Sequence, residues 1–231
     1  MPIQPILSSM KPLIIIDNGH GVNTPGKRSP VWPDGSQLLE GRWTRNIARD
    51  VVERLLLLGY DARLLVPEER DVPLTVRIKR AREWVCEHKQ RGGIAAQRLM
   101  VSIHANASAA LPTADDVPSS SRKPSGWEAF MHGSDANCRE LGCELYRKAL
   151  DLLPERFPIR TRSGNARRGI PLFPKRAEFY LLAYAPCVAI LTENLFMDNV
   201  DDCRYLLSDE GRRSIVQLHV QAIDDYLRKR L

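Results

Sequence analysis

Short apolar runs alternate along this chain with longer stretches in which apolar residues recur every three or four positions. The short runs are rich in β-branched residues or alternate apolar with polar side chains, which is typical of strands. We expect strands at residues 13–17, 62–66, 99–103, 126–132 and 188–191. The longer stretches predict helices at residues 38–58, 74–91, 141–152 and 215–227. This alternation favours an α/β domain with a largely parallel sheet.

Polar segments separate these elements. Asp34 and Gln37 resemble a capping box, so we expect the first helix to start there and to end at Gly59. Residues 158–174 predict a long basic loop. The polar stretch 107–125 contains three prolines and three consecutive serines, and it predicts an insertion loop at the surface.

Two histidines stand where apolar runs stop. His20 follows the first run within the segment DNGHG, and His104 follows the third within SIHAN. Glu40 lies between them in the chain, and Glu193 ends a later apolar run. Because strand ends at one edge of an α/β sheet commonly carry the chemistry, we expect these four side chains to converge.

Two imidazoles and two carboxylates in one place favour a hydrolytic zinc site. Catalytic zinc commonly takes three protein ligands and leaves one position for water, whose pKa it lowers. His20 and His104 are the imidazole candidates, and Glu40, early in a helix, is the carboxylate candidate. Glu193 then remains to take a proton from the water and return it to a leaving amine.

Each of these residues also has a structural interpretation. A histidine near a strand end is commonly a hydrogen-bonded structural group, and Glu40 alone would be an exposed helix residue. Glu128 remains open as the ligand in place of Glu40. Glu193 is costly to bury unless it is paired or metal-linked. The residues alone therefore predict a metal-assisted hydrolase acting on an amide.

Size and composition fit one globular domain. The chain has 231 residues, of which 43% are hydrophobic and 27% charged, so a sizeable core is expected. No apolar stretch approaches the ~20 residues that span a bilayer. Residues 1–11 lack a basic start and an apolar core region, so we expect synthesis in the cytoplasm without a secretory signal.

The charge is basic and clustered. The formal net charge is +6, and the cations gather in one part of the chain and at its end. The main cluster comprises Arg160, Arg162, Arg167, Arg168, Lys175 and Arg176. Such a surface is either a solvated face or a site for acidic partners. Few aromatic residues that could stack on bases lie there, chiefly Phe157 and Phe173, so we do not expect nucleic acid as the partner.

The five cysteines form no C-x-x-C pair, and we expect reduced thiols. Cys138 and Cys143, with His132 nearby, are a weaker alternative metal site.

The motifs together resemble a known family. DNGHG after a strand, a glutamate twenty positions on, SIHAN, a Gly-aromatic-Glu strand at 126–128 and a late strand ending in Glu193 resemble the zinc-dependent N-acetylmuramoyl-L-alanine amidases of the amidase-3 type. The resemblance runs from Leu13 to about Leu227. It implies a single catalytic domain over residues 1–231, with a short extension at 1–11 and the insertion loop at 107–125. The implied fold is a mostly parallel mixed sheet flanked by helices on both faces.

The resemblance also implies a reaction. His20, Glu40 and His104 would bind one catalytic Zn²⁺, a zinc-bound water would be the nucleophile, and Glu193 would be the general base and acid. The substrate would be peptidoglycan, cleaved at the amide between N-acetylmuramic acid and L-alanine, so the protein would act on the cell wall, in the periplasm or outside the cell. Two other hypotheses stay open: a zinc peptidase for another wall-peptide amide, and a non-catalytic basic domain that binds the wall or nucleic acid.

Overall fold

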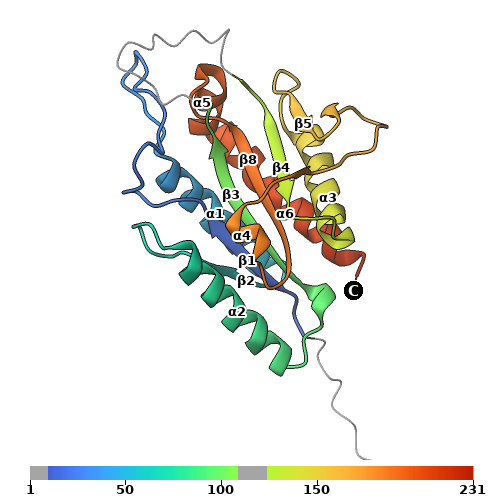
Figure 1. The fold of residues 1–231 in the computed structure, drawn as a ribbon. Helices are drawn as coiled ribbons and strands as arrows, with labels where there is room; N and C mark the ends of the chain where they lie inside the picture. Colours follow the sequence, from blue (N-terminus) through green and yellow to red (C-terminus); the bar gives the residue numbers. More distant parts are fainter. Residues whose placement is uncertain (1–9, 109–123, 231) are drawn as a thin grey trace, which may run out of the picture.

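A computed structural model describes residues 10–108 and 124–230 of the chain (Figure 1). An eight-stranded mixed sheet forms its centre, in the order β2-β1-β3-β8-β4-β5-β6, with β7 paired to β4. The strands are β1 (Leu13–Asn18), β2 (Asp61–Leu64), β3 (Arg98–Asn106), β4 (Trp127–Met131), β5 (Ile159–Thr161), β6 (Gly164–Asn165), β7 (Lys175–Arg176) and β8 (Val188–Phe196). The pairs β4–β8 and β5–β6 are antiparallel, and all the other pairs are parallel.

Helices cover both faces of this sheet (Figure 1). They are α1 (Glu40–Leu57), α2 (Leu74–Gln90), α3 (Ala136–Leu152), α4 (Tyr180–Ala183), α5 (Val200–Leu207) and α6 (Asp209–Arg228). Helices α1, α3, α5 and α6 contribute to one core, and α2 and α4 contribute to the other. The predicted α/β architecture is therefore confirmed.

The continuously apolar sequence of strand β1 is explained by its burial on both faces of the sheet. Ile14 and Ile16 point into the core with α1, whereas Leu13 and Ile15 point into the core with α2. All four side chains are fully buried. A parallel strand covered on both faces needs apolar residues at every position, and each such side chain contributes roughly 1.5–3 kcal/mol. This burial fixes the strand whose end carries His20.

The start of the first helix differs from the sequence expectation. Asp34 caps no helix; its Oδ1 accepts hydrogen bonds from the backbone N–H and the hydroxyl of Ser36 (3.0 and 2.6 Å). Helix α1 begins at Glu40, because Leu39 is held extended in an antiparallel bridge with Arg28. The expected capping box was therefore wrong.

Other differences concern lengths and short elements. Strands β3 and β8 continue through His104 and Glu193, so these residues lie within strands. The expected loop at 158–174 contains the short strands β5 and β6. Residues 1–9 and 109–123, which include most of the expected extension and insertion loop, lie outside the described residues. In the part of the chain that the structure describes, no helix is long and apolar enough to cross a membrane.

Candidate active site

The candidate site lies at the carboxyl edge of three adjacent parallel strands. In the ladder, Asn18 of β1 is in register with Ile103 of β3, and His104 of β3 is in register with Glu193 of β8. His20 lies two residues after the end of β1. The sheet therefore brings His20, His104 and Glu193 to one edge, as expected for the carboxyl ends of parallel strands.

Tight packing fixes the turn that carries His20. His20 has a φ of +59°, a left-handed conformation that a non-glycine residue adopts only when its surroundings demand it. A Cβ atom at Gly19 would clash with the ring of His104, and one at Gly21 would clash with the backbone of Asp71. The two glycines thus let the chain pass close enough to His104 for the imidazoles to meet.

Arg77 of α2 stabilises the chain next to this turn through hydrogen bonds. Its guanidinium donates to Asp17 Oδ1 (2.8 Å), to the carbonyl of Asn18 (2.7 Å) and to Asp71 Oδ1 (2.8 Å). The side chains of Arg77 and Asp17 are 3% and 1% exposed, so the pair is almost fully removed from water. Arg77 therefore joins the end of β1 to the segment that packs against the His20 turn.

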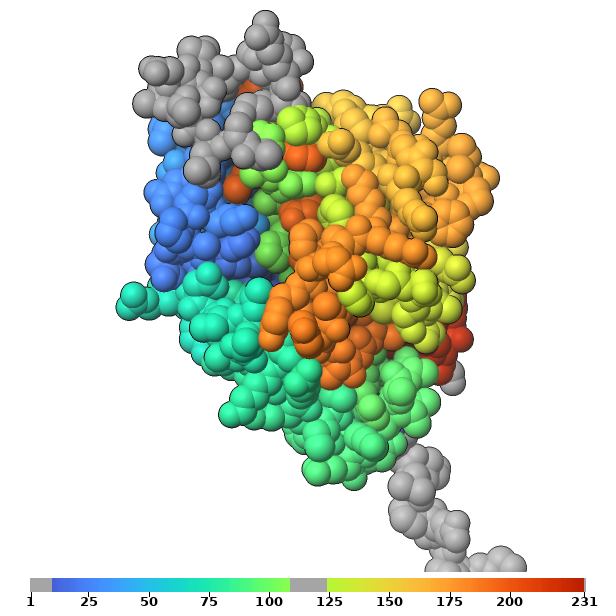
Figure 2. Space-filling model, in the orientation of Figure 1, coloured from blue at the N-terminus to red at the C-terminus, as the bar shows by residue number. Residues whose placement is uncertain are grey.

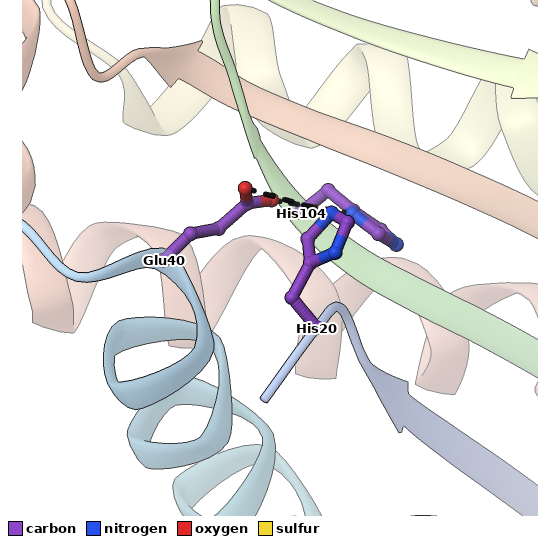
Figure 3. A group of neighbouring side chains, drawn as sticks. All are labelled: His20, Glu40 and His104. Carbon is purple, nitrogen blue, oxygen red and sulfur yellow. Dashed lines mark hydrogen bonds and ion pairs between the residues drawn. The ribbon is translucent and has the colours of Figure 1, made fainter. Parts of the chain in front are cut away.

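Glu40 reaches the same place from the start of α1. A Cβ atom at Gly41 would clash with the backbone of Gly21, so the helix begins directly against the His20 turn. Thr44, one turn along α1, donates to the carbonyl of Gly19 (2.8 Å). The Glu40 side chain is 1% exposed and points at both imidazoles (Figure 3).

The three side chains form a compact donor group. Glu40 Oε1 lies 3.2 Å from His104 Nδ1, and Glu40 Oε2 lies 3.6 Å from His20 Nε2. One donor atom from each residue lies within 4.8 Å of the other two. Glu40 Oε2 is buried and has no hydrogen-bond partner. A buried carboxylate oxygen without a partner is costly, so this atom fits a cation held between the three groups.

The ionisation of His20 and Glu40 suits metal binding, whereas His104 would have to lose a proton first. Burial, partly opposed by the charge of Glu40, lowers the pKa of His20 to about 4 and keeps its imidazole neutral. Burial alone would raise the pKa of Glu40, but hydrogen bonding to His104 and the nearby imidazoles give a net lowering. For His104, the hydrogen bond and the charges of Glu40 and Glu193 outweigh burial and raise its pKa. A cation would displace the proton that the raised pKa favours on His104.

Glu193 faces the group from β8. Its Oε2 is buried without a hydrogen-bond partner. Burial and the negative charge of Glu40 raise the pKa of Glu193 to about 8, although His104 acts in the opposite direction. A carboxyl group with a pKa near neutrality is suited to accept and return a proton.

These residues line one cleft of about 700 Å³ (Figure 2). Its lining includes His20, Glu40, His104 and Glu193. In Figure 2 it lies between the blue surface of the N-terminal part and the orange surface around α4. The cleft is large enough for a segment of a polymer to reach the donor group.

Comparison with known protein families identifies the family of this chain. A family model described as N-acetylmuramoyl-L-alanine amidase matches residues 14–225. The chain belongs to this family. Its members are hydrolases of peptidoglycan, and the expected enzyme class is thereby confirmed.

Solved structures of amidases share the fold. An N-acetylmuramoyl-L-alanine amidase from Clostridium difficile 630 superposes with a TM-score of 0.71 at 19% identity, covering 96% of this chain and 100% of that one. AmiC2 of Nostoc punctiforme gives a TM-score of 0.64 at 23% identity, covering 95% and 99%. Ami1 from Mycobacterium smegmatis gives 0.66 at 16% identity, covering 96% and 100%. No curated protein matches the chain.

In this amidase Glu128 lies outside the donor group. Its Oε1 accepts from Asn106 Nδ2 (2.7 Å), and its Oε2 is paired with Lys175. Its backbone is in register with Glu193 across β4 and β8. The structure therefore favours Glu40 over Glu128 as the carboxylate beside the histidines.

The alternative metal site at Cys138, Cys143 and His132 does not form a comparable group. Within residues 10–108 and 124–230, only His20, Glu40 and His104 bring three metal-ligating side chains together. Cys143 donates to the carbonyl of Leu172 (2.8 Å), and Cys138 accepts from the N–H of Ala189 (3.4 Å).

Two cations of the cleft, Lys27 and Arg77, are not among the residues predicted for the site. Arg77 carries a signal in hindsight. It lies three residues after Leu74 and one before Ile78, on the helix stripe that the apolar spacing assigned to the core. A charged residue on such a stripe needs a buried partner, which here is Asp17. Lys27 lies in a loop, where no comparable signal exists.

Proposed function

We propose that this amidase is zinc dependent and cleaves the amide between N-acetylmuramic acid and the L-alanine of the stem peptide. The observation that carries the proposal is the group formed by His20, Glu40 and His104, with Glu193 facing it across the sheet edge. Two imidazoles and one carboxylate are a donor set that hydrolytic zinc sites use. Because peptidoglycan is a wall polymer, the proposed place of action is the cell wall.

The donor set would hold the metal, and its neighbours would keep the ligands in place. His20 would be fixed by its constrained turn, and Glu40 by the start of α1. The backbone N–H of Ala105 donates to Glu40 Oε1 (3.2 Å), which would leave Oε2 for the cation. When bound, zinc supplies a lowered pKa of water and polarisation of the scissile carbonyl.

Glu193 would move the protons. With its pKa raised to about 8, Glu193 exchanges protons near neutral pH, and its carboxylate form would accept a proton from the attacking water. The same group would then return that proton to the amine of the departing alanine. The C–N bond breaks as the water oxygen bonds to the lactyl carbonyl carbon, so atoms and charge balance.

Digestion of purified peptidoglycan tests the proposal. Zinc-loaded protein is expected to release peptides that begin with alanine and to leave intact glycan strands, as read by mass spectrometry. Protein treated with a chelator is expected to release none until zinc returns. Cuts inside the stem peptide would favour the zinc peptidase hypothesis instead. Equal release by metal-free protein would contradict zinc dependence.

A further inference from the structure

Lys27 is fixed beside the donor group by its backbone. Its carbonyl accepts a hydrogen bond from the N–H of Glu40 (3.0 Å). The next residue, Arg28, forms a bridge with Leu39, and the N–H of Ser29 donates to the carbonyl of Leu38 (2.8 Å). The loop before α1 is thus tied to the helix start, and Lys27 lines the cleft beside Glu40.

The two cations of the cleft, Lys27 and Arg77, differ in their ion pairing. Arg77 is neutralised by Asp17 and Asp71. Lys27, in contrast, forms no ion pair with any residue in the described ranges, and its side chain is partly exposed. It lines the same cleft as Glu40 and Glu193. An ammonium that has no ion-pair partner among the described residues, in the cleft that also holds Glu40 and Glu193, is available to an anionic part of a ligand.

The two sides of the cleft differ in chemistry. Phe179, Tyr180 and Leu181 contribute an apolar and aromatic wall around α4, whereas Lys27 contributes a positive charge from the loop before α1. A neutral N-acetylated sugar suits the aromatic wall. The scissile amide is also neutral, so the free carboxylates of the substrate lie on its peptide side.

We infer that Lys27 is a specificity-determining residue that binds a carboxylate of the stem peptide next to the scissile amide. The inference rests on the proposed function, since it concerns the substrate of the same site. Lys27 makes the enzyme distinguish a free carboxylate from a carboxamide at that position. A charge-assisted hydrogen bond of this kind corresponds to about a 10- to 100-fold preference.

Two synthetic muramyl peptides test the inference. They are identical except that the residue after alanine carries either a carboxylate or a carboxamide. The wild-type zinc enzyme is expected to prefer the carboxylate by about 10- to 100-fold in kcat/KM. Lys27→Met is expected to lose the preference mainly through a raised KM for the carboxylate, and Lys27→Arg is expected to keep part of it. Arg28→Met, the matched control one residue on, is expected to keep the wild-type preference.

Binding and metal content provide readouts that do not depend on turnover. Glu193→Gln is expected to bind the carboxylate peptide more tightly than the carboxamide in calorimetry, and the added Lys27→Met change is expected to abolish the difference. Zinc content measured for each variant verifies that the donor group is intact.

The outcomes separate the two proposals. A Lys27→Met enzyme that keeps the preference, or that loses the same factor on both peptides, would overturn the inference alone. A wild-type enzyme that cleaves neither peptide would overturn the proposed function, and the inference with it.

Discussion

His104 and Glu193 are paired in register across the parallel strands β3 and β8. Backbone hydrogen bonds of the sheet, rather than a loop, therefore set the separation between a candidate metal ligand and the candidate proton carrier. Sites built on regular elements hold their geometry more tightly than sites built on loops. The irregularity of the ladder falls just after this pair, between His104 and Asn106, and pairing resumes at Asn106 and Phe196.

The first prediction concerns Glu193. Glu193→Gln removes the group that exchanges protons but keeps its size, and Glu193 is not among the three clustered donors. We expect kcat for the muramyl amide to fall by about 10²- to 10⁴-fold while the zinc content stays at the wild-type level. Kinetics and metal analysis on the same sample measure both. An unchanged kcat would show that another group moves the proton.

The second prediction concerns the metal ligands. His20→Ala and His104→Ala each remove one of the three clustered donors, so we expect both variants to lose zinc after dialysis. Glu128→Gln is the matched carboxylate control. Because Glu128 is engaged with Asn106 and Lys175, this variant is expected to retain zinc. Loss of zinc from Glu128→Gln, with retention in His104→Ala, would contradict the assignment.

The third prediction concerns the buried pair of Arg77 and Asp17. Arg77→Met leaves the Asp17 carboxylate buried without its partner, which costs about 3–5 kcal/mol of unfolding free energy. Arg80→Met is the matched control on the same helix. Its partner Glu68 is 42% exposed, and such surface pairs contribute less than about 1 kcal/mol. Urea denaturation of both variants measures the difference in unfolding free energy. Equal losses of unfolding free energy in the two variants would contradict the stabilising role of the Arg77–Asp17 pair.

The fourth prediction concerns acid stability and His219. This histidine is fully buried: Nδ1 lies 2.7 Å from the carbonyl of Ile215, and Nε2 lies 2.9 Å from Thr192 Oγ1. Burial lowers its pKa from 6.5 to about 4, so the unfolded chain takes up this proton first on acidification. The stability is therefore present above pH 6.5 and is lost as the pH falls towards 4, by up to about 3 kcal/mol.

Denaturation of chelator-treated protein between pH 7 and pH 4 measures this effect. His219→Gln removes the titrating group and is expected to flatten the pH profile in part, since the pKa of His20 is also lowered to about 4. A profile as steep as that of the wild type would contradict the role of His219.

The predictability of the fold from sequence depended on how each element is stabilised. The strand at Leu13 was predictable because burial on both faces leaves a continuous apolar run. The start of α1 was not, because Leu39 is kept extended by a distant residue, Arg28. Helix α4 spans only Tyr180–Ala183, which is too short to show a helical period.

The candidate site was likewise predictable from the sequence only in part. His20 and His104 drew attention because each follows an apolar run within a distinctive turn. Their proximity to Glu40 depends on Gly19 and Gly41, whose missing side chains permit close approach, and no spacing rule encodes that. The roles of Lys27 and Arg77 depend on whether a carboxylate faces them, which only the folded chain reveals.

The position of β8 in the chain also determines when during synthesis Glu193 can join the three clustered donors. This strand is the last to leave the ribosome, yet it lies between β3 and β4 in the interior of the sheet. Contacts so distant in sequence close late and slow the folding of a domain. A nascent chain, or one truncated before Val188, contains the three clustered donors but lacks Glu193. Under the proposed mechanism, such a chain lacks the group that moves the protons, so the site is completed only after β8 has been synthesised.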